Sequence, residues 1–249
     1  MLTALKRRRA ELDTWLTERG LAHTFSLPAH QLYRQTLPLV EAHARGRCLD
    51  AGSGRSPWRL RLLARGLEVL SLDVEDRVGG VDIIADLQDM PAVADASMET
   101  VLCTQVLEHV SRPWDAVSEL ARVLAPGGHL ILSAPHLSML HEVPHDYYRY
   151  TRYGLTSLLQ ERGFRVLEMR ESGGLVSFLC HPLSMGLMTT LGSLPGLRRF
   201  VWALNFALFV KAAAAVDALL GLRSLFPCNY VVLARREGPE LAPSSAETP

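Results

Sequence analysis

The stretch that decides the fold is Arg47-Cys-Leu-Asp-Ala-Gly-Ser-Gly-Arg-Ser56. Its small and apolar residues Cys48, Leu49 and Ala51 surround Asp50, as in a short buried strand, and the chain continues into a turn that contains Gly52 and Gly54. Glycine adopts positive φ without steric cost and lets a ligand come close to the backbone. Pro57 then precedes a helical pattern, in a position that a first helical turn accepts. Strand, glycine turn and helix in this order form the nucleotide-binding unit of doubly wound α/β folds.

A second apolar run, residues 67–73, ends in Asp73, nineteen positions after Gly54. An acidic residue about 20 positions beyond the glycines is the expected acceptor for ribose hydroxyls, so the two stretches predict a site for an adenine nucleoside. A dinucleotide is disfavoured because Pro57 stands where G-x-G-x-x-G needs its third glycine. The carboxylate of Asp50 would also repel a pyrophosphate, whereas it would attract a ligand that carries an amino group.

Four more motifs follow the glycine turn LDAGSG (49–54) in order: LDV at 72–74, ADLQDMP at 85–91, CTQVLEHV at 103–110 and LAPGGHLIL at 124–132. With this set, residues 47–171 resemble the class I S-adenosylmethionine (SAM)-dependent methyltransferases that act on small molecules, the type 11 and type 23 groups. SAM has a sulfonium, an ammonium group and a ribose but no phosphate, so it suits this turn. The resemblance implies a Rossmann-like, doubly wound α/β fold with a seven-stranded sheet and an antiparallel seventh strand.

The resemblance also implies how SAM and its product S-adenosylhomocysteine are held. Asp86 accepts a hydrogen bond from the adenine amino group, and the backbone N–H of Leu87 donates to a ring nitrogen. Gln105 follows the fourth strand at the carboxyl edge of the sheet, where such sheets bind ligands, and faces the methionine part. The expected cofactor-binding residues are Asp50, Ala51, Gly52, Ser53, Gly54, Asp73, Val74, Asp86, Leu87 and Gln105.

Residues 135–151, PHLSMLHEVPHDYYRYT, leave the same edge after the fifth strand. They contain H-E-x-x-H, which binds zinc only on a continuous helix, and Pro144 interrupts a helix there, so we predict no metal site. The stretch instead resembles a P-x-D-Y-Y-R-Y-T segment of one methyltransferase branch, often found alongside sugar or natural-product pathways. A histidine can take the proton of a hydroxyl acceptor, so His141, His145 and His136 are candidate general bases. The alternative for each is a hydrogen bond within the loop.

The acceptor itself stays open. Methyl transfer to oxygen is favoured over transfer to nitrogen or carbon, and a small, partly apolar metabolite or natural product is the expected acceptor. Asp146 and Arg149 are expected to brace the loop through an ion pair, and the Glu-His pair at 108–109 often positions a loop in this family. The expected substrate-binding residues are Tyr33, His109, Asp146, Tyr147 and Arg149.

The pattern divides the chain into four parts. Residues 1–45 predict N-terminal helices (2–19 and 29–45), either a lid over the cofactor or simple packing on the sheet. Residues 46–173 and 227–236 form the SAM-binding core. Residues 174–226 are an apolar helical insertion between strands six and seven, and residues 237–249 have no core pattern and predict a disordered tail.

The insertion predicts helices at 175–192 and 200–222. The second helix is about long enough to span a bilayer, but Lys211 and Asp217 each disfavour insertion by ~2.5–3.5 kcal/mol. Three roles remain, in order of preference: a cap over the acceptor, a homodimer face, or a peripheral membrane contact. An enzyme that methylates a membrane lipid or glycolipid is therefore a rival, and so is a non-catalytic SAM-binding scaffold.

Charge and cysteine content narrow the class further. The 26 basic and 26 acidic residues give zero net charge, so nothing indicates nucleic acid as a partner. The motif N/D-P-P-Y/F of nucleic-acid methyltransferases is also missing after the fourth strand. Four cysteines without C-x-x-C spacing, and the lack of a signal-peptide pattern, predict reduced thiols in a cytoplasmic protein.

Overall fold

The computed structural model describes residues 7, 11, 12, 14–16, 19, 21–24, 26–77 and 79–238. The predicted helix over 2–19 lies largely outside the described residues, and so does most of the predicted tail. The chain divides into two compact units. The first unit holds the residues up to Leu37 together with 136–138 and 171–230, and the second holds 38–135, 139–170 and the residues from Val231 onward.

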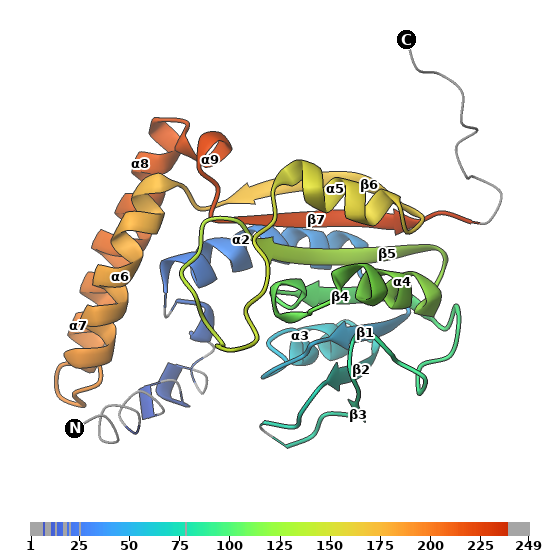
Figure 1. Ribbon diagram of the computed structural model, residues 1–249. Helices are drawn as coiled ribbons and strands as arrows, with labels where there is room; N and C mark the ends of the chain where they lie inside the picture. Colours follow the sequence, from blue (N-terminus) through green and yellow to red (C-terminus); the bar gives the residue numbers. More distant parts are fainter. Residues whose placement is uncertain are drawn as a thin grey trace, which may run out of the picture. The chain divides into compact units, whose positions relative to one another are not determined.

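The described residues form one seven-stranded sheet with the order β3-β2-β1-β4-β5-β7-β6. Strand β1 pairs in parallel with β2 and β4, β2 with β3, and β4 with β5, whereas β7 runs opposite to its neighbours β5 and β6 (Figure 1). The strands are β1 (Arg47–Ala51), β2 (Glu68–Asp73), β3 (Ile83–Ile84), β4 (Met98–Thr104), β5 (Leu124–Pro135), β6 (Phe164–Ser172) and β7 (Asn229–Arg236). The predicted Rossmann-like sheet with an antiparallel seventh strand is therefore confirmed.

The central strands form the core. Leu49 of β1, Val101 of β4 and Ile131 of β5 are each fully buried, as expected for parallel strands that are covered on both faces. The parallel arrangement brings the carboxyl ends of β1, β2 and β4 to one edge of the sheet, and the loops that follow them start there.

Helices connect the strands of the second unit. They are α2 (Leu27–His43, which begins in the first unit), α3 (Arg59–Ala64), the 3-10 turn η2 (Leu107–His109), α4 (Pro113–Val123) and α5 (Arg152–Gln160). Pro38 lies inside α2 and does not divide it. Strand β5 already begins at Leu124, because Pro126 to Gly128 form a bulge within the strand: Met98 pairs with Leu124, and Thr100 pairs with His129.

The first unit contains the apolar insertion. Its helices are η1 (Ala22–Thr24), α6 (Leu175–Thr190), α7 (Arg198–Asn205), the π-helical η3 (Phe206–Ala212), α8 (Ala213–Leu219) and α9 (Leu222–Leu225). The predicted helix over 200–222 ends earlier, because Gly221 adopts a left-handed conformation (φ +65°). Within the described residues, the run Arg198–Leu219 is the one helix long and apolar enough to cross a membrane by length and composition.

The carboxylate within this apolar run, Asp217, has a structural role. Its side chain is fully buried and accepts hydrogen bonds from the backbone N–H groups of Val176 (2.9 Å) and Ser177 (3.0 Å) and from the Ser177 hydroxyl. These N–H groups belong to the first turn of α6, which has no partners for them within the helix. Asp217 therefore caps α6 from the neighbouring helix α8.

Candidate functional site

The glycine turn ties β1 to β2. The N–H groups of Gly52 and Ser53 both donate to the carbonyl oxygen of Leu72, at 2.8 and 2.9 Å. Gly52 has φ +71°, and a Cβ atom at this position would lie 2.3 Å from a methyl carbon of Val106. Gly54 also has positive φ (+53°). Glycine is required at Gly52 both for its backbone conformation and for the space it leaves.

Asp73 stands beside this turn at the end of β2. Its Oδ2 accepts a hydrogen bond from the Gly54 N–H at 2.7 Å, and its Oδ1 is 3.3 Å from the N–H of Glu75. The side chain is 9% exposed, so its remaining hydrogen-bonding capacity is open to a ligand in the adjoining cavity. The predicted ribose acceptor thus also holds the turn in place.

A cavity of about 590 Å³ lies at this edge of the second unit. Its volume is in the range of roughly 300–1,000 Å³ that small-molecule sites occupy. Seven of the ten predicted cofactor residues line it, with two predicted substrate residues and two of the predicted bases on its walls. These are Gly52, Gly54, Asp73, Val74, Asp86, Leu87 and Gln105, then His109 and Tyr147, then His141 and His145.

The other three predicted cofactor residues are buried and do not line the cavity. Ala51 and Ser53 are part of the turn itself. The Oδ2 of Asp50 accepts a hydrogen bond from the Ser56 hydroxyl at 2.7 Å, and burial raises the pKa of the Asp50 carboxyl to about 6. Asp50 therefore shapes the turn from behind, and a direct contact between Asp50 and SAM stays a prediction.

Asp86 is held by a residue that sequence reasoning missed. Gln88 donates to the Asp86 carboxylate from its backbone N–H (2.9 Å) and from its side-chain amide (3.0 and 2.9 Å). The Gln88 side-chain oxygen accepts from the backbone N–H of Arg112 at 3.0 Å. Gln88 thus orients Asp86 against the loop that precedes α4. The signal was its place inside the motif ADLQDMP.

Gln105 has an unusual backbone at the end of β4. It is a non-glycine residue with φ +57°, a conformation that costs free energy and gathers at functional sites. Its backbone N–H donates to the carbonyl oxygen of Ser133 (3.0 Å), and its side-chain amide donates to the Ser133 hydroxyl (3.3 Å). These bonds to β5 hold Gln105 at the cavity wall.

The loop between β5 and α5 forms the opposite wall, and it contains no helix. The predicted ion pair is present: the Arg149 guanidinium donates to both Asp146 oxygens, at 2.6 and 2.8 Å, and keeps the pKa of that carboxyl well below its usual range. Asp146 and Arg149 lie outside the cavity lining and brace the loop. Tyr147 and His145 line the cavity, and the Tyr147 hydroxyl lies 3.2 Å from Nδ1 of His145.

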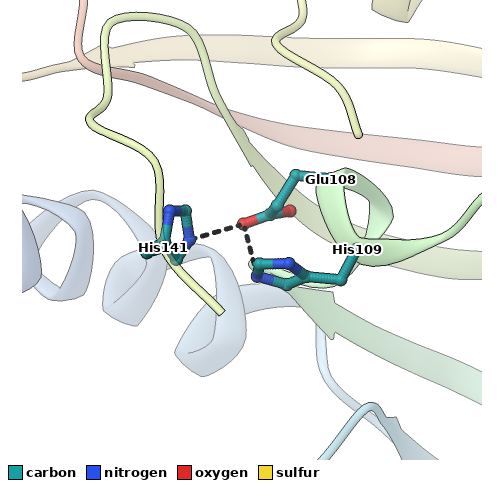
Figure 2. Close-up of side chains that lie close together, drawn as sticks. All are labelled: Glu108, His109 and His141. Carbon is teal, nitrogen blue, oxygen red and sulfur yellow. Dashed lines mark ion pairs between the residues drawn. The ribbon is translucent and has the colours of Figure 1, made fainter. Parts of the chain in front are cut away.

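Glu108 is the second residue that sequence reasoning missed as a site residue. It lies in η2, has no exposed surface, and neither carboxylate oxygen has a hydrogen-bond partner. Figure 2 shows its carboxylate directed at two imidazoles: Oε1 is 3.8 Å from Nε2 of His109 and 3.9 Å from Nε2 of His141. Burial raises the pKa of the Glu108 carboxyl to about 8 and lowers the pKa of His109.

Two predicted site residues belong to the first unit. The Tyr33 ring stacks on His23 with centroids 4.2 Å apart. The His136 backbone N–H donates to the carbonyl oxygen of Cys228 at 2.8 Å, and its ring lies 5.8 Å from that of Tyr230. The roles of Tyr33 in substrate binding and of His136 in catalysis stay predictions.

Comparison with known proteins agrees with this arrangement. Residues 49–132 match the family model described as a methyltransferase domain. An uncharacterized methyltransferase from Mycobacterium sp. (strain KMS) is 33% identical over 94 residues, which cover 34% of this chain and only 37% of that protein. The ubiquinone biosynthesis O-methyltransferase of Burkholderia pseudomallei (strain 1710b) is 25% identical over 176 residues, covering 57% of this chain and 76% of that protein.

A solved structure shares the fold. The SAM-dependent methyltransferase from Archaeoglobus fulgidus aligns with a TM-score of 0.53 over 82% of this chain and 91% of that chain, at 17% identity. At this identity the likeness concerns the fold alone. The strand order and the solved structure confirm the predicted Rossmann-like fold. The match of residues 49–132 to a methyltransferase domain, and the methyltransferase relatives, agree with the predicted class I SAM-dependent methyltransferase and with SAM as its cofactor.

Proposed function

We propose that this protein transfers the methyl group of SAM to a hydroxyl oxygen of a small, partly apolar acceptor, such as a natural-product intermediate. One observation carries the proposal. One cavity is lined by Gly52, Gly54 and Asp73 and also by His141 and His145. The first set suits the nucleoside of SAM, and the second suits a proton that must leave the acceptor.

Residues of the cavity lining would hold SAM. Asp73 would accept the ribose hydroxyls, while Asp86 and the backbone of Leu87 would bind the adenine ring. Gln105, fixed by its bonds to Ser133, would meet the methionine part.

The reaction needs few groups from the protein. The acceptor oxygen attacks the methyl carbon, the carbon–sulfur bond breaks, and its electron pair stays on sulfur, which leaves neutral S-adenosylhomocysteine. The acceptor proton passes to a base. Holding oxygen, carbon and sulfur in line can lower the barrier by roughly 7–11 kcal/mol, and general base catalysis adds a factor of about 10²–10⁴.

His145 is the stronger candidate for the base. Its ring is exposed at the cavity wall, and its Nδ1 lies 3.2 Å from the Tyr147 hydroxyl, which can fix the ring's orientation. The His141 ring is already engaged, since its Nδ1 lies 3.1 Å from the Met139 carbonyl oxygen and its Nε2 faces Glu108. The O-methyltransferase relative from Burkholderia pseudomallei supports oxygen as the acceptor atom.

A membrane-borne acceptor is the second candidate, and one observation favours it. Apolar side chains along the helical run 198–220 are exposed: Phe200 is 68%, Leu208 is 55% and Leu219 is 84% accessible. Such a surface suits a peripheral membrane contact or a homodimer face. Sedimentation with phosphatidylcholine vesicles that is lost in a Phe200→Ser/Leu219→Ser variant would support the membrane contact.

The proposal is tested by S-adenosylhomocysteine release. The wild type is incubated with SAM and a panel of phenolic and aliphatic hydroxyl compounds, each compared with its amine and thiol analogue. The proposal is supported if a hydroxyl compound is methylated and if this turnover falls about 10²-fold or more in His145→Ala. Turnover should be unchanged in the control Arg47→Ala, because Arg47 begins β1 at the opposite edge of the sheet from the cavity. Turnover confined to the amines would assign transfer to nitrogen. SAM binding without turnover of any acceptor would favour the scaffold reading.

A further inference from the structure

Three metal-ligand side chains meet on the cavity wall. They are Glu108 and His109 of η2 and His141 of the loop after β5, and their donor atoms all lie within 4.8 Å of one another (Figure 2). The histidines line the cavity, and the carboxylate lies buried behind them. Gly52, Gly54 and Asp73, the residues proposed to hold the SAM nucleoside, are not part of this cluster.

We propose that Glu108, His109 and His141 bind a divalent transition-metal ion such as Zn²⁺. Two imidazoles and one carboxylate form the ligand set of many catalytic zinc sites and of the facial triad that binds iron(II). Metal–ligand bonds of about 2.0–2.2 Å in a tetrahedron put the donor atoms roughly 3.4 Å apart. The distances of 3.8 and 3.9 Å from Glu108 are close to this spacing, and the widest separation in the cluster, which is at most 4.8 Å, would have to shorten when the ion binds.

The unpartnered Glu108 carboxylate is the first argument. Its oxygens are buried and accept no hydrogen bond from the described residues. Buried polar atoms almost always find a hydrogen-bond partner, so a buried carboxyl group without one needs an explanation. A cation between Glu108 and the two imidazoles would supply that partner.

The outer hydrogen bonds of the histidines are the second, independent argument. Nδ1 of His109 lies 2.6 Å from the carbonyl oxygen of His145, and Nδ1 of His141 lies 3.1 Å from that of Met139. A carbonyl oxygen only accepts, so each Nδ1 carries the proton and each Nε2 is left with its lone pair. Both lone pairs face the Glu108 carboxylate. This is the outer-shell pattern that orients metal-binding histidines.

The role of the ion rests on the proposed function. Three protein ligands would leave at least one coordination position open, as in catalytic zinc sites, and both histidines of the set line the cavity. An acceptor hydroxyl bound there would lose its proton more readily, because a metal ion lowers the pKa of an oxygen ligand. The proton would pass to His145, and the oxygen would be held for attack on the methyl group.

This assignment also revises the interpretation of H-E-x-x-H. The motif does not form a helical zinc site, because the loop contains no helix. Its first histidine, His141, nevertheless joins Glu108 and His109, and its second, His145, contributes only its carbonyl oxygen as the partner of His109. The prediction of no metal site rested on the local motif H-E-x-x-H alone. The cluster of Glu108, His109 and His141 instead depends on a contact between η2 and the loop after β5.

Metal binding is measured directly on the full chain. Apoprotein is prepared with a chelator and titrated with Co²⁺ alone, whose visible absorption reports its ligands, and Zn²⁺ binding is measured by equilibrium dialysis. The wild type is expected to bind one ion per chain. Glu108→Gln and His141→Ala are expected to weaken binding by about 100-fold or more, since even outer-shell changes cost roughly 10–100-fold. His129→Ala is the matched control, because its ring lies elsewhere in the unit, with Nδ1 3.2 Å from the His43 carbonyl oxygen.

The outcomes are separable. If the wild type binds no Co²⁺ or Zn²⁺, or if Glu108→Gln and His141→Ala bind like the wild type, the metal inference is overturned and Glu108 is a neutral, buried acid. Circular dichroism shows whether each variant is folded, and His141→Ala, on a partly exposed loop, serves if Glu108→Gln does not fold. SAM binding is titrated in parallel without metal, so loss of SAM binding alone would count against the proposed function and leave the metal site standing.

Discussion

The backbone N–H of Gly54 donates a hydrogen bond to Oδ2 of Asp73 over 2.7 Å. The bond joins the turn after β1 to the residue that ends β2. The register of the two parallel strands allows this bond. Ala51 pairs with Leu72, so the residues that follow them, the glycine turn and Asp73, lie at the same edge of the sheet. Asp73 therefore serves the shape of the site and, in our proposal, the binding of the ribose.

These two roles can be separated at Asp73. Asn keeps an oxygen that accepts from Gly54 but loses the charge and one acceptor. Since hydrogen bonds to charged groups contribute about 1.5–3 kcal/mol, we expect Asp73→Asn to weaken SAM binding roughly 10–100-fold, with a melting temperature close to that of the wild type. Asp73→Ala should weaken SAM binding further and also lower the melting temperature. Calorimetric titration and thermal melts measure both. An Asp73→Asn variant that binds SAM like the wild type would show that the ribose contact lies elsewhere.

Gly52 should tolerate no side chain. Ala at Gly52 would bring Cβ within 2.3 Å of a Val106 methyl carbon and also require positive φ. Gly66 has positive φ (+79°) in open space, so Gly66→Ala measures the backbone cost alone, about 1–2 kcal/mol. We expect Gly52→Ala to cost more than Gly66→Ala in urea unfolding and to weaken SAM binding. Gly52→Ala/Val106→Ala should recover the excess. Equal costs for the two single variants would contradict the steric explanation.

Asp50 should make stability depend on pH. Its carboxyl has a pKa of about 6 in the folded protein against an ordinary value of 3.8, so folding favours the protonated form. The stability that this preference contributes is present at low pH and lost as the pH rises through about 6. Asp50→Asn removes the charge and should therefore be more stable than the wild type at pH 8, by about 1–3 kcal/mol, with the difference fading toward pH 4.

Urea unfolding at several pH values measures this difference. Ser56→Ala is the companion variant, because it removes the hydroxyl that donates to Asp50 and should lower stability at pH 8, where Asp50 is charged, more than at pH 5. A pH-independent difference between Asp50→Asn and the wild type would contradict a buried, titrating carboxyl. SAM affinity of Asp50→Asn, measured alongside, shows whether Asp50 also matters for the cofactor.

Asp217 should stabilise the first unit through its bonds to α6. Asp217→Ala leaves the N–H groups of Val176 and Ser177 without their acceptor. We expect the free energy of unfolding to fall by about 2–4 kcal/mol, because hydrogen bonds to charged groups are the strong ones. Lys211→Ala is the control in the same helical run, with an exposed side chain over the Phe206 ring, and should change stability by less than about 1 kcal/mol. Similar losses in both variants would refute the capping role.

Much of this site could be predicted because it is local. Gly52, Gly54 and Asp73 follow from strand, turn and spacing, since two parallel neighbours end at the same edge. Asp86 and Gln105 follow in the same way from the ends of their strands. The bulge that lengthens β5 could not be predicted, since Pro126 to Gly128 look like a plain turn in the sequence.

Contacts between segments far apart in the chain could not be predicted from the sequence pattern. Glu108 lies near His141 because the irregular loop after β5, which has no hydrophobic periodicity, folds back over η2. The backbone N–H of Tyr147 donates to the Glu108 carbonyl oxygen at 2.8 Å and holds the loop against η2. Gln88 gains its role through Arg112, which lies in another motif. The capping by Asp217 likewise depends on the packing of α8 against α6, so the sequence marked Asp217 only as a charge in an apolar run.

The central claim is that the glycine-turn cavity binds SAM. Isothermal titration of the wild type with SAM, and then with S-adenosylhomocysteine, tests it most directly. We predict one site per chain for both ligands with micromolar affinity, and a clear loss of affinity for both in Asp73→Asn. Absence of binding by a folded wild type, or binding that Asp73→Asn and Gly52→Ala leave unchanged, would contradict the account.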